Sequence, residues 1–517
     1  MPDEDFIGES LRKIAKGAGI GFTGSFIGKA FGYFSMIIIA RFLGTSNYGL
    51  ILLGVAGMSI VSTLSMVGLP AGIERYVSFY KGKGDKRRIK GTILSAIKIN
   101  FPLSLILALL FFFGSDWISI HVFHEPNLIP VLRIFAITIP FFVLASDFIA
   151  ATIGFQDLRY RVYVNDLFLN IFKLTAMVVF IWLGFGVLGA TWGWALAVIL
   201  TPFLAFYFLE KRVFPVLNTR VKSIPMEREL FSYSWPLIFS GVAGFVRDWT
   251  DTIMLGFFLT ASAVGIYNVA LPTAGLLRVV SKSFSVIFMP VISELYAKNK
   301  EEELKRVYAA VTKWVISLAL PGFLLMALFS KTIIGIIFGA EYIEGAMALS
   351  ILAFEFFIFG VLSFANSVIG AYGKTKIIMI GSLIGACANV GLNFLLIPMY
   401  GINGAATATG LSIILPSILY LFFVYRIGRM HPFRMSHFRP VFASIISVLV
   451  IYGVTKYVLG VSLLVLIIMC FIFLALYFFL LLLMKGFEEE DLMIMRAIDE
   501  RVGIKTDLPR KIIRKFL

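Results

Sequence analysis

Several ionisable side chains lie within long apolar stretches of this 517-residue sequence, where a charge is costly and is therefore a candidate for function. The cations are Lys29, Lys173, Arg247, Arg278 and Lys282. Because Arg278 and Lys282 are four residues apart, a helix places them on one face, about 6 Å from each other. Neighbouring like charges repel unless an anion lies between them, and a guanidinium binds phosphate oxygens through two hydrogen bonds. The spacing predicts an anion-binding face.

Four carboxylates share these apolar surroundings, namely Asp147, Asp248, Asp251 and Glu355. A buried carboxylate beside a cation stays ionised, whereas one among apolar groups can carry a proton. Asp248 is adjacent to Arg247, and Asp251 follows Arg247 by one helical turn. The four residues are therefore candidates either for coupling to an ion gradient or for ion pairing, and Arg247 could be neutralised within its own helix.

Signatures of catalysis and metal binding are missing from the sequence. It contains no HExxH, CxxC or glycine-rich phosphate loop, and its two cysteines, Cys387 and Cys470, both lie in apolar runs. A net charge of +16 could suggest nucleic-acid binding in a soluble protein, but no recognition module accompanies it. We predict no catalytic residue, metal, cofactor or nucleic-acid partner.

The elements that must position these charges are membrane-spanning helices. Hydrophobic residues make up 59% of the sequence and charged residues 15%, and the mean hydropathy is +0.92. This composition indicates an all-α polytopic membrane protein, because each span needs roughly 20 apolar residues. The predicted spans are 18–42, 48–70, 92–114, 128–153, 163–184, 187–209, 232–258, 264–290, 311–337, 345–370, 377–399, 402–425, 441–459 and 461–484, which makes about fourteen.

Basic residues gather on alternate connections between these spans, for example Arg87 and Arg88 after the second span and Arg212 and Arg220 after the sixth. Such connections are usually cytoplasmic, so we expect both termini on the cytoplasmic side of the cell membrane. The predicted parts are a cytoplasmic N-terminal segment at 1–17, a six-helix bundle at 18–209, a cytoplasmic basic linker at 210–231, a second six-helix bundle at 232–425, a cytoplasmic loop at 426–440, two further helices in 441–484, and a cytoplasmic amphipathic tail at 485–517 that contacts membrane lipids.

An internal repeat relates the two predicted bundles. A shift of 216 residues places Leu43 and Gly49 on Leu259 and Gly265. An even number of helices per repeat gives two parallel, pseudo-symmetric halves, an arrangement that transporters use for alternating access. The cations do not follow the repeat, since Lys29 corresponds to Phe245, Arg247 to Phe31, Arg278 to Ser62 and Lys282 to Met66.

The stretches at 28–49 (GKAFGYFSMIIIARFLGTSNYG), 68–75 (GLPAGIER) and 259–267 (LTASAVGIY) resemble segments of the oligosaccharide-lipid flippases of the polysaccharide transporter (Wzx-like) type. The resemblance runs from about residue 15 to 485. It implies membership of the multidrug/oligosaccharidyl-lipid/polysaccharide exporter superfamily and a V-shaped cavity lined by the first, second, seventh and eighth spans. Fourteen spans favour the polysaccharide and peptidoglycan-precursor branches, because the multidrug exporters usually have twelve.

We therefore predict a flippase, not an enzyme, that moves a polyprenyl-(di)phosphate-linked oligosaccharide across the membrane by alternating access. Lys29, Arg247, Arg278 and Lys282 would bind the phosphate. The expected partners are this substrate, membrane lipids, and polysaccharide polymerase or transferase proteins. A cation-coupled multidrug exporter of the same superfamily is the alternative. A membrane glycan polymerase or ligase ranks third, because the predicted external connections are too short to carry a catalytic loop.

Overall fold

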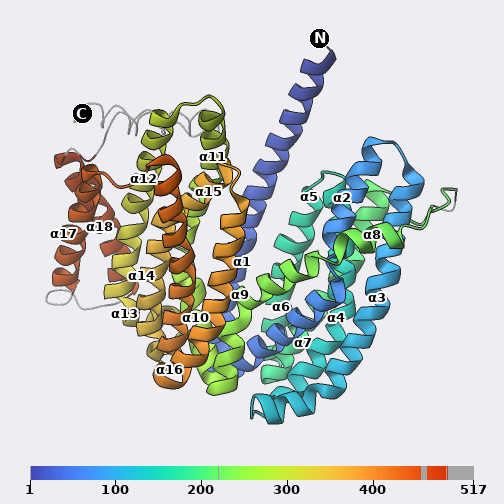
Figure 1. Ribbon diagram of the computed structural model, residues 1–517. Coiled ribbons are helices and arrows are strands. Elements are labelled where there is room, and N and C mark those ends of the chain that lie inside the picture. Colours follow the sequence, from blue (N-terminus) through green and yellow to red (C-terminus); the bar gives the residue numbers. More distant parts are fainter. Residues whose placement is uncertain (1, 219, 456–462, 485, 487–517) are drawn as a thin grey trace. The chain divides into compact units, whose positions relative to one another are not determined.

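The computed structural model describes the backbone of residues 2–218, 220–455, 463–484 and 486 (Figure 1). Side chains are described from Phe26 onward, except at 286, 287, 463, 464, 466, 467 and 470. Cys470 and, apart from residue 486, the predicted tail at 485–517 therefore lie outside the described side chains. Every secondary-structure element of the described part is a helix. The contacts divide the chain into two units, Met1–Ile266 and Tyr267–Leu517.

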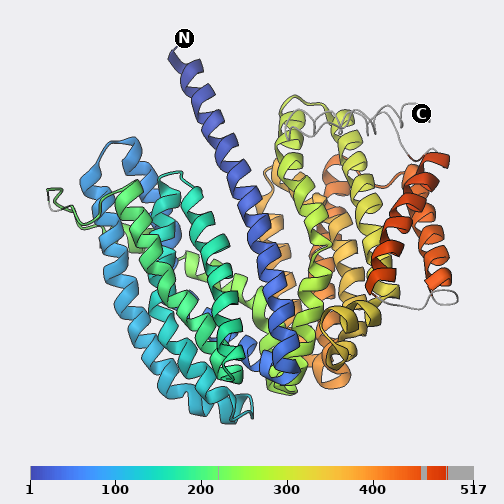
Figure 2. The same cartoon turned by 180° about the vertical axis from the view of Figure 1, so that it is seen from behind.

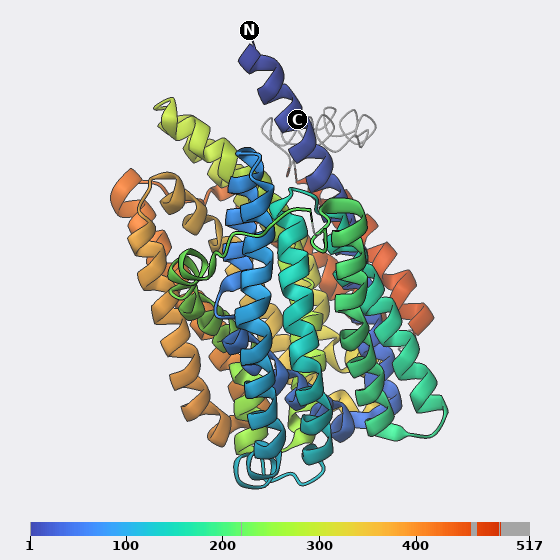
Figure 3. The same cartoon turned by 90° about the vertical axis from the view of Figure 1, so that its right-hand side faces the viewer.

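Unit 1 is a bundle organised around α4 (Leu128–Gly154), which packs against α1, α2, α3 and α7. Figure 3 shows α3, α4 and α7 running side by side. The core of unit 1 includes Leu69, Ile73, Val77, Ile149 and Leu230. Its other elements are α1 (Pro2–Met66), α2 (Leu69–Gly82), α3 (Lys86–Trp117), η1 (Ile118–Val122), α5 (Arg159–Arg161), η2 (Val162–Phe168), α6 (Leu169–Trp182), α7 (Gly186–Phe208), η3 (Leu209–Val213), α8 (Glu227–Ser234), α9 (Leu237–Phe258) and the start of α10 (Ala261–Gly275).

Unit 2 is organised around α14 (Ala346–Leu362), which packs against α12 and α16. Helices α17 and α18 lie side by side at one edge of this unit, and α17 also packs against α12 (Figure 2). The other elements are the remainder of α10, α11 (Arg278–Ala297), α12 (Glu301–Leu328), α13 (Ser330–Ile337), η4 (Ala340–Gly345), α15 (Phe364–Ala371), α16 (Thr375–Gly428), η5 (Met435–His437), α17 (Phe438–Val454) and α18 (Leu463–Leu483).

Ten helices of the described part are long and apolar enough to cross a membrane, so the chain is an all-helical, multi-pass membrane protein. Two of the ten, Phe26–Met66 and Thr375–Gly428, each cover two predicted spans. The break inside each is a glycine with positive φ, at Gly44 (φ 74°) and Gly401 (φ 58°), a conformation that glycine adopts readily. Helices α9 and α18 occupy the predicted spans 232–258 and 461–484 but are not among the ten, and α9 carries Arg247, Asp248 and Asp251. The number fourteen stays a prediction.

One predicted span does not form a single continuous helix. The predicted span 48–70 is interrupted at Val67 (φ 49°) and Gly68 (φ 71°), after which the chain continues as α2 to residue 82. Positive φ at a β-branched residue such as Val67 is strained, and hydropathy contains no signal for it. The contact-based division at Ile266 also differs from the predicted bundles at 18–209 and 232–425, which therefore stay a prediction.

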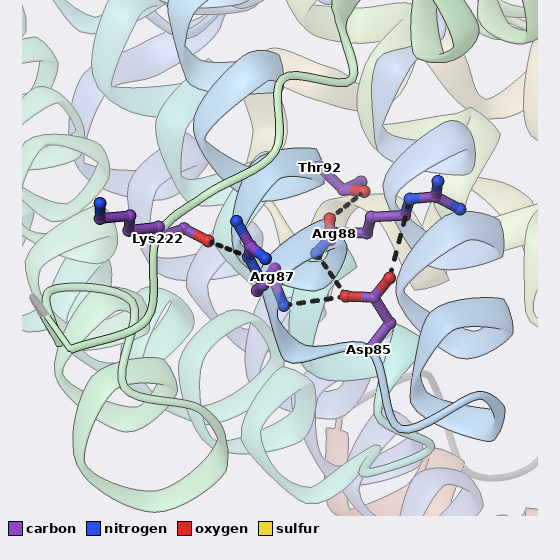
Figure 4. Close-up of polar contacts among 5 residues, drawn as sticks. All are labelled: Asp85, Arg87, Arg88, Thr92 and Lys222. Carbon is purple, nitrogen blue, oxygen red and sulfur yellow. Dashed lines mark hydrogen bonds and ion pairs between the residues drawn. The ribbon is translucent and has the colours of Figure 1, made fainter.

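The predicted basic linker at 210–231 lies along the beginning of α3. The Asp85 carboxylate caps α3 by accepting hydrogen bonds from the backbone N–H groups of Arg87 and Arg88, both at 3.1 Å. Arg87 Nε donates to the carbonyl of Lys222 at 3.4 Å (Figure 4). Lys90 Nζ donates to the carbonyl of Asn218 at 2.7 Å. Basic side chains at the start of α3 thereby hold the linker against the rest of unit 1.

Two helical segments that correspond under the internal repeat, 45–49 on α1 and 261–265 on α10, also contact each other. A Cβ atom on Gly49 would overlap the carbonyl of Ala261, and a Cβ atom on Gly265 would overlap the carbonyl of Thr45. Because 45 and 49 correspond to 261 and 265 under the 216-residue shift, the contact is reciprocal. Ser262 Oγ donates to Thr45 Oγ1 at 2.8 Å across the same contact.

Replacing Gly49 with alanine is expected to destabilise the protein by about 1–3 kcal/mol, because the added methyl group would push against a rigid backbone carbonyl. Gly391→Ala is the matched control, since a Cβ at Gly391 meets nothing within 4 Å. The measurement is thermal unfolding of the two purified variants in detergent. Equal melting temperatures for Gly49→Ala and the native chain would contradict the reciprocal contact.

Candidate functional site

Lys29 lies on α1, next to the face of α1 that packs against η2 and α6. A Cβ on Gly28 would come within 2.7 Å of the Cβ of Asp166, and one on Gly32 within 3.6 Å of Asn170 Oδ1. The glycines therefore allow α1 to approach η2 and the start of α6 closely. Lys29 is exposed, because it is rotated by about 100° from Gly28 around the helix.

Arg247 and Asp248 are both exposed on α9, whereas Asp251 is buried. The Arg247 Nε atom lies 3.4 Å from Asp248 Oδ1, and the two side chains are 70% and 65% exposed. Such an exposed ion pair stabilises little. Arg247 therefore pairs with Asp248, its neighbour in the sequence, but this ion pair is weak.

Arg278 and Lys282 lie one turn apart on α11, and both are exposed. The Arg278 guanidinium carbon lies 5.2 Å from the ring centroid of Phe356 and 5.6 Å from that of Phe359, both on α14. An aromatic face attracts and orients a guanidinium without cancelling its charge. The close approach of α11 and α14 is helped by Gly360, where an added Cβ atom would lie 3.6 Å from Ser281.

Glu355 precedes Phe356 on α14 and is buried, 5% exposed. Its carboxyl group rests against the backbone of Gly410 on α16, where a Cβ would overlap it. The neighbouring Thr409 Oγ1 hydrogen-bonds the Tyr267 hydroxyl at 2.8 Å. Asn389 Nδ2 lies 3.5 Å from Ser412 Oγ on the same helix. Glu355 thus lies beside a buried polar region of unit 2.

Asp147 is fully buried on α4. Asn100 Nδ2 on α3 donates to both carboxyl oxygens of Asp147, at 2.9 and 3.1 Å. The bonded neighbour of Asp147 is therefore a neutral amide and not a cation. The sequence did not predict Asn100 as the partner of Asp147, because Asn100 lies 47 residues earlier in the chain.

Lys173 lies on α6 and points at the indole ring of Trp194 on α7, with Nζ 4.6 Å from the ring centroid. Its ammonium group also donates to Asn170 Oδ1 at 3.3 Å. These contacts give Lys173 a cation–π and a hydrogen-bond partner inside unit 1.

Within each unit, the structure brings together only some of the predicted residues. In unit 2, Arg278 and Glu355 are linked through Phe356, which follows Glu355 and lies under the guanidinium. In unit 1, Arg247 and Asp248 are paired, whereas Asp147 lies with Asn100. Five residues that contact the predicted ones were not predicted from the sequence, because aromatic and hydroxyl residues are common in membrane helices and carry no positional signal there. They are Phe356, Phe359, Trp194, Tyr267 and Thr409.

This arrangement can bind ions of both signs. Exposed guanidinium and ammonium groups can bind an anion, and buried carboxyl groups can bind a proton or a small cation. No group of three or more His, Cys, Asp or Glu residues among the described side chains could hold a metal ion. The fold and these charges together define a multi-pass membrane transporter.

The comparisons with known proteins agree with this class. A family model described as polysaccharide biosynthesis protein matches residues 14–296, and a second, MatE, matches residues 236–395. Because the first match covers more than half of the chain, the chain belongs to the polysaccharide biosynthesis protein family. It is a transporter of this family and not an enzyme, as the sequence predicted.

Curated relatives and solved structures are similar over most of the chain. A probable low-salt glycan biosynthesis flippase, Agl15 of Haloferax volcanii, is 26% identical over 409 residues, which are 77% of this chain and 81% of the relative. The structure of lipid II flippase MurJ in an inward closed conformation has a TM-score of 0.68 at 18% identity and covers 89% of this chain and 97% of its own. An inward-facing multidrug resistance MATE family transporter has a TM-score of 0.62 at 17% identity, covering 76% of this chain and 93% of its own. The structural likeness concerns the fold.

Replacing Gly410 with alanine is expected to destabilise the protein by about 1–3 kcal/mol, because the new methyl group would displace the buried Glu355 carboxyl. The additional change Glu355→Ala should recover part of that loss, since it removes the group that the methyl strikes. The measurement is a double-mutant cycle on thermal unfolding, with Gly391→Ala on the same helix as the control. Strictly additive effects would show that residues 355 and 410 are not in contact.

Proposed function

We propose that this chain is a flippase that translocates a polyprenyl-(di)phosphate-linked oligosaccharide across the cytoplasmic membrane, for surface polysaccharide or glycoprotein biosynthesis. The observation that carries the proposal is the pair of exposed cations on α11, with Arg278 held over two aromatic rings of α14. Lys29 and Arg247 are proposed as further anion-binding residues.

The chemistry of α11 suits a phosphate-bearing headgroup. Arg278 and Lys282 present two positive charges about one turn apart, a distance that a phosphate or diphosphate can bridge. The guanidinium offers paired donors to phosphate oxygens, and the lysine adds a mobile point charge.

The names of the relatives support the same substrate class. Agl15 and lipid II flippase MurJ of Bacillus subtilis are both described as flippases, and the matching family is described by polysaccharide biosynthesis. The proposed movement is alternating access by the two repeats. The charged headgroup would cross between them while the lipid tail stays in the bilayer. Both termini would be cytoplasmic, and polymerase or transferase proteins would use the translocated product.

A second candidate is a cation-coupled exporter of the same superfamily, which the buried carboxylates favour. Glu355 lies in a buried polar region and Asp251 is 5% exposed, so both are sheltered enough to bind a cation or a proton. The MatE match at residues 236–395 includes both positions. Such an exporter would depend on Glu355 and Asp251 and would tolerate loss of the α11 cations.

Arg278→Gln is expected to lower flipping of a fluorescent lipid-diphosphate oligosaccharide in proteoliposomes by about tenfold or more, because charge-assisted hydrogen bonds to phosphate contribute about 1.5–3 kcal/mol. Arg278→Lys should keep part of the activity. Lys298→Gln is the control, since Lys298 is an exposed residue at the end of α11 that pairs with Glu294.

The opposite pattern would favour the exporter. Unchanged flipping in a folded Arg278→Gln variant, together with loss of activity in Glu355→Gln or Asp251→Asn, would remove the support for phosphate binding by α11. Absence of flipping for every lipid-linked sugar by the native chain would reject the flippase itself.

A further inference from the structure

A carboxyl–amide pair formed by Asp147 and Asn100 lies inside the apolar core of unit 1. Both residues are fully buried, and Asn100 Nδ2 donates to the two Asp147 oxygens at 2.9 and 3.1 Å. Phe148, Ala150 and Ala151 on α4 and Ala96 on α3 belong to the surrounding core cluster. An ionised carboxylate in such surroundings is costly unless a cation or several donors stabilise it.

The pair has one polar atom that its present arrangement does not use. Among the described residues, Asn100 Oδ1 is buried without a hydrogen-bond partner. Buried polar atoms are normally paired, so an orphan beside a titratable group needs a reason. A half-turn about the Cβ–Cγ bond exchanges Oδ1 and Nδ2, and Oδ1 can then accept a hydrogen bond from a protonated Asp147 oxygen. One amide therefore suits both protonation states of the carboxyl group.

No cation of the described part bonds to Asp147. Lys98, near Asn100 on α3, is exposed and pairs with Glu227 at 3.1 Å, and Glu210 of η3 accepts from the backbone of Leu217. The elements that pack against α3 and α4 carry further titratable groups, which include Glu74 and Tyr80 on α2, Tyr48 on α1, Arg161 on α5 and Tyr207 on α7. None of them makes a hydrogen bond or an ion pair with Asp147 in the described part.

We propose that Asp147 and Asn100 form a proton-binding site of unit 1, in which one proton adds to an Asp147 carboxyl oxygen and the Asn100 amide turns to accept its hydrogen bond. The step consumes one proton from water and involves no other reactant. Protonation removes a negative charge from the core and exchanges two acceptors for a donor and an acceptor. It thereby alters how α3 and α4 bond to each other.

As a transport device, this site rests on the proposed function, because the proton would then bias the conformations between which the flippase alternates. As a binding site, it does not depend on the substrate. The two aspects can therefore be tested separately.

The binding test is infrared difference spectroscopy of the purified full chain in liposomes while the pH is changed. The native protein is expected to show a carboxyl C=O band that appears on acidification, and Asp147→Asn, which keeps the size of the side chain, is expected to lose it. Asp116→Asn is the matched control, because Asp116 is a half-exposed carboxylate paired with Arg133. Asn100→Ala, which removes the amide, should shift the midpoint of the band.

A band that persists unchanged in Asp147→Asn, or a midpoint unmoved by Asn100→Ala, would overturn the proton site. In flipping assays with lipid-diphosphate oligosaccharide, the native rate should vary with pH and the Asp147→Asn rate should lose that variation. A pH profile shared by both proteins would reject the coupling. If the native chain flips no lipid-linked glycan, the proposed function fails while the infrared titration still decides the proton site.

Discussion

The cost of a charge among apolar helices determines where this protein can place each ionisable group. In the described part, the exposed cations Arg278 and Lys282 lie on the surface of a helix, whereas Asp147 and Glu355 are buried and contact an amide or a backbone. Guanidinium and ammonium groups on long stems reach the surface easily, but a short carboxylate stays where its helix puts it. This distribution supports the proposed roles, in which the cations bind the substrate and the buried carboxyl groups bind small ions.

Unit 2 links these two kinds of group through one helix. Glu355 and Phe356 are consecutive on α14, so one faces Gly410 on α16 and the other lies beneath the Arg278 guanidinium on α11. A shift of α14 would move both contacts. Arg278 therefore depends for its orientation on a helix whose packing includes a titratable side chain.

Hydropathy and charge pattern predicted the helical class, the positions of most helices and the cations on α11, because each depends on local composition or spacing. The break at Val67–Gly68 could not be predicted, since hydropathy does not respond to backbone dihedral angles. The contact partners of the site residues could not be predicted from the sequence either. Asn100 meets Asp147, and Thr409 meets Tyr267, across 47 and 142 residues of sequence, and neither pairing has a local pattern.

The reciprocal contact of Gly49 with Ala261 and of Gly265 with Thr45 has the form of an isologous dimer interface, in which residue i of one copy meets residue j of the other and the reverse. The same pseudo-symmetry does not extend to the side chains that carry charge. The position equivalent to Arg278 holds Ser62, so this cation and its contact with two aromatic rings belong to one half of the aligned sequence alone.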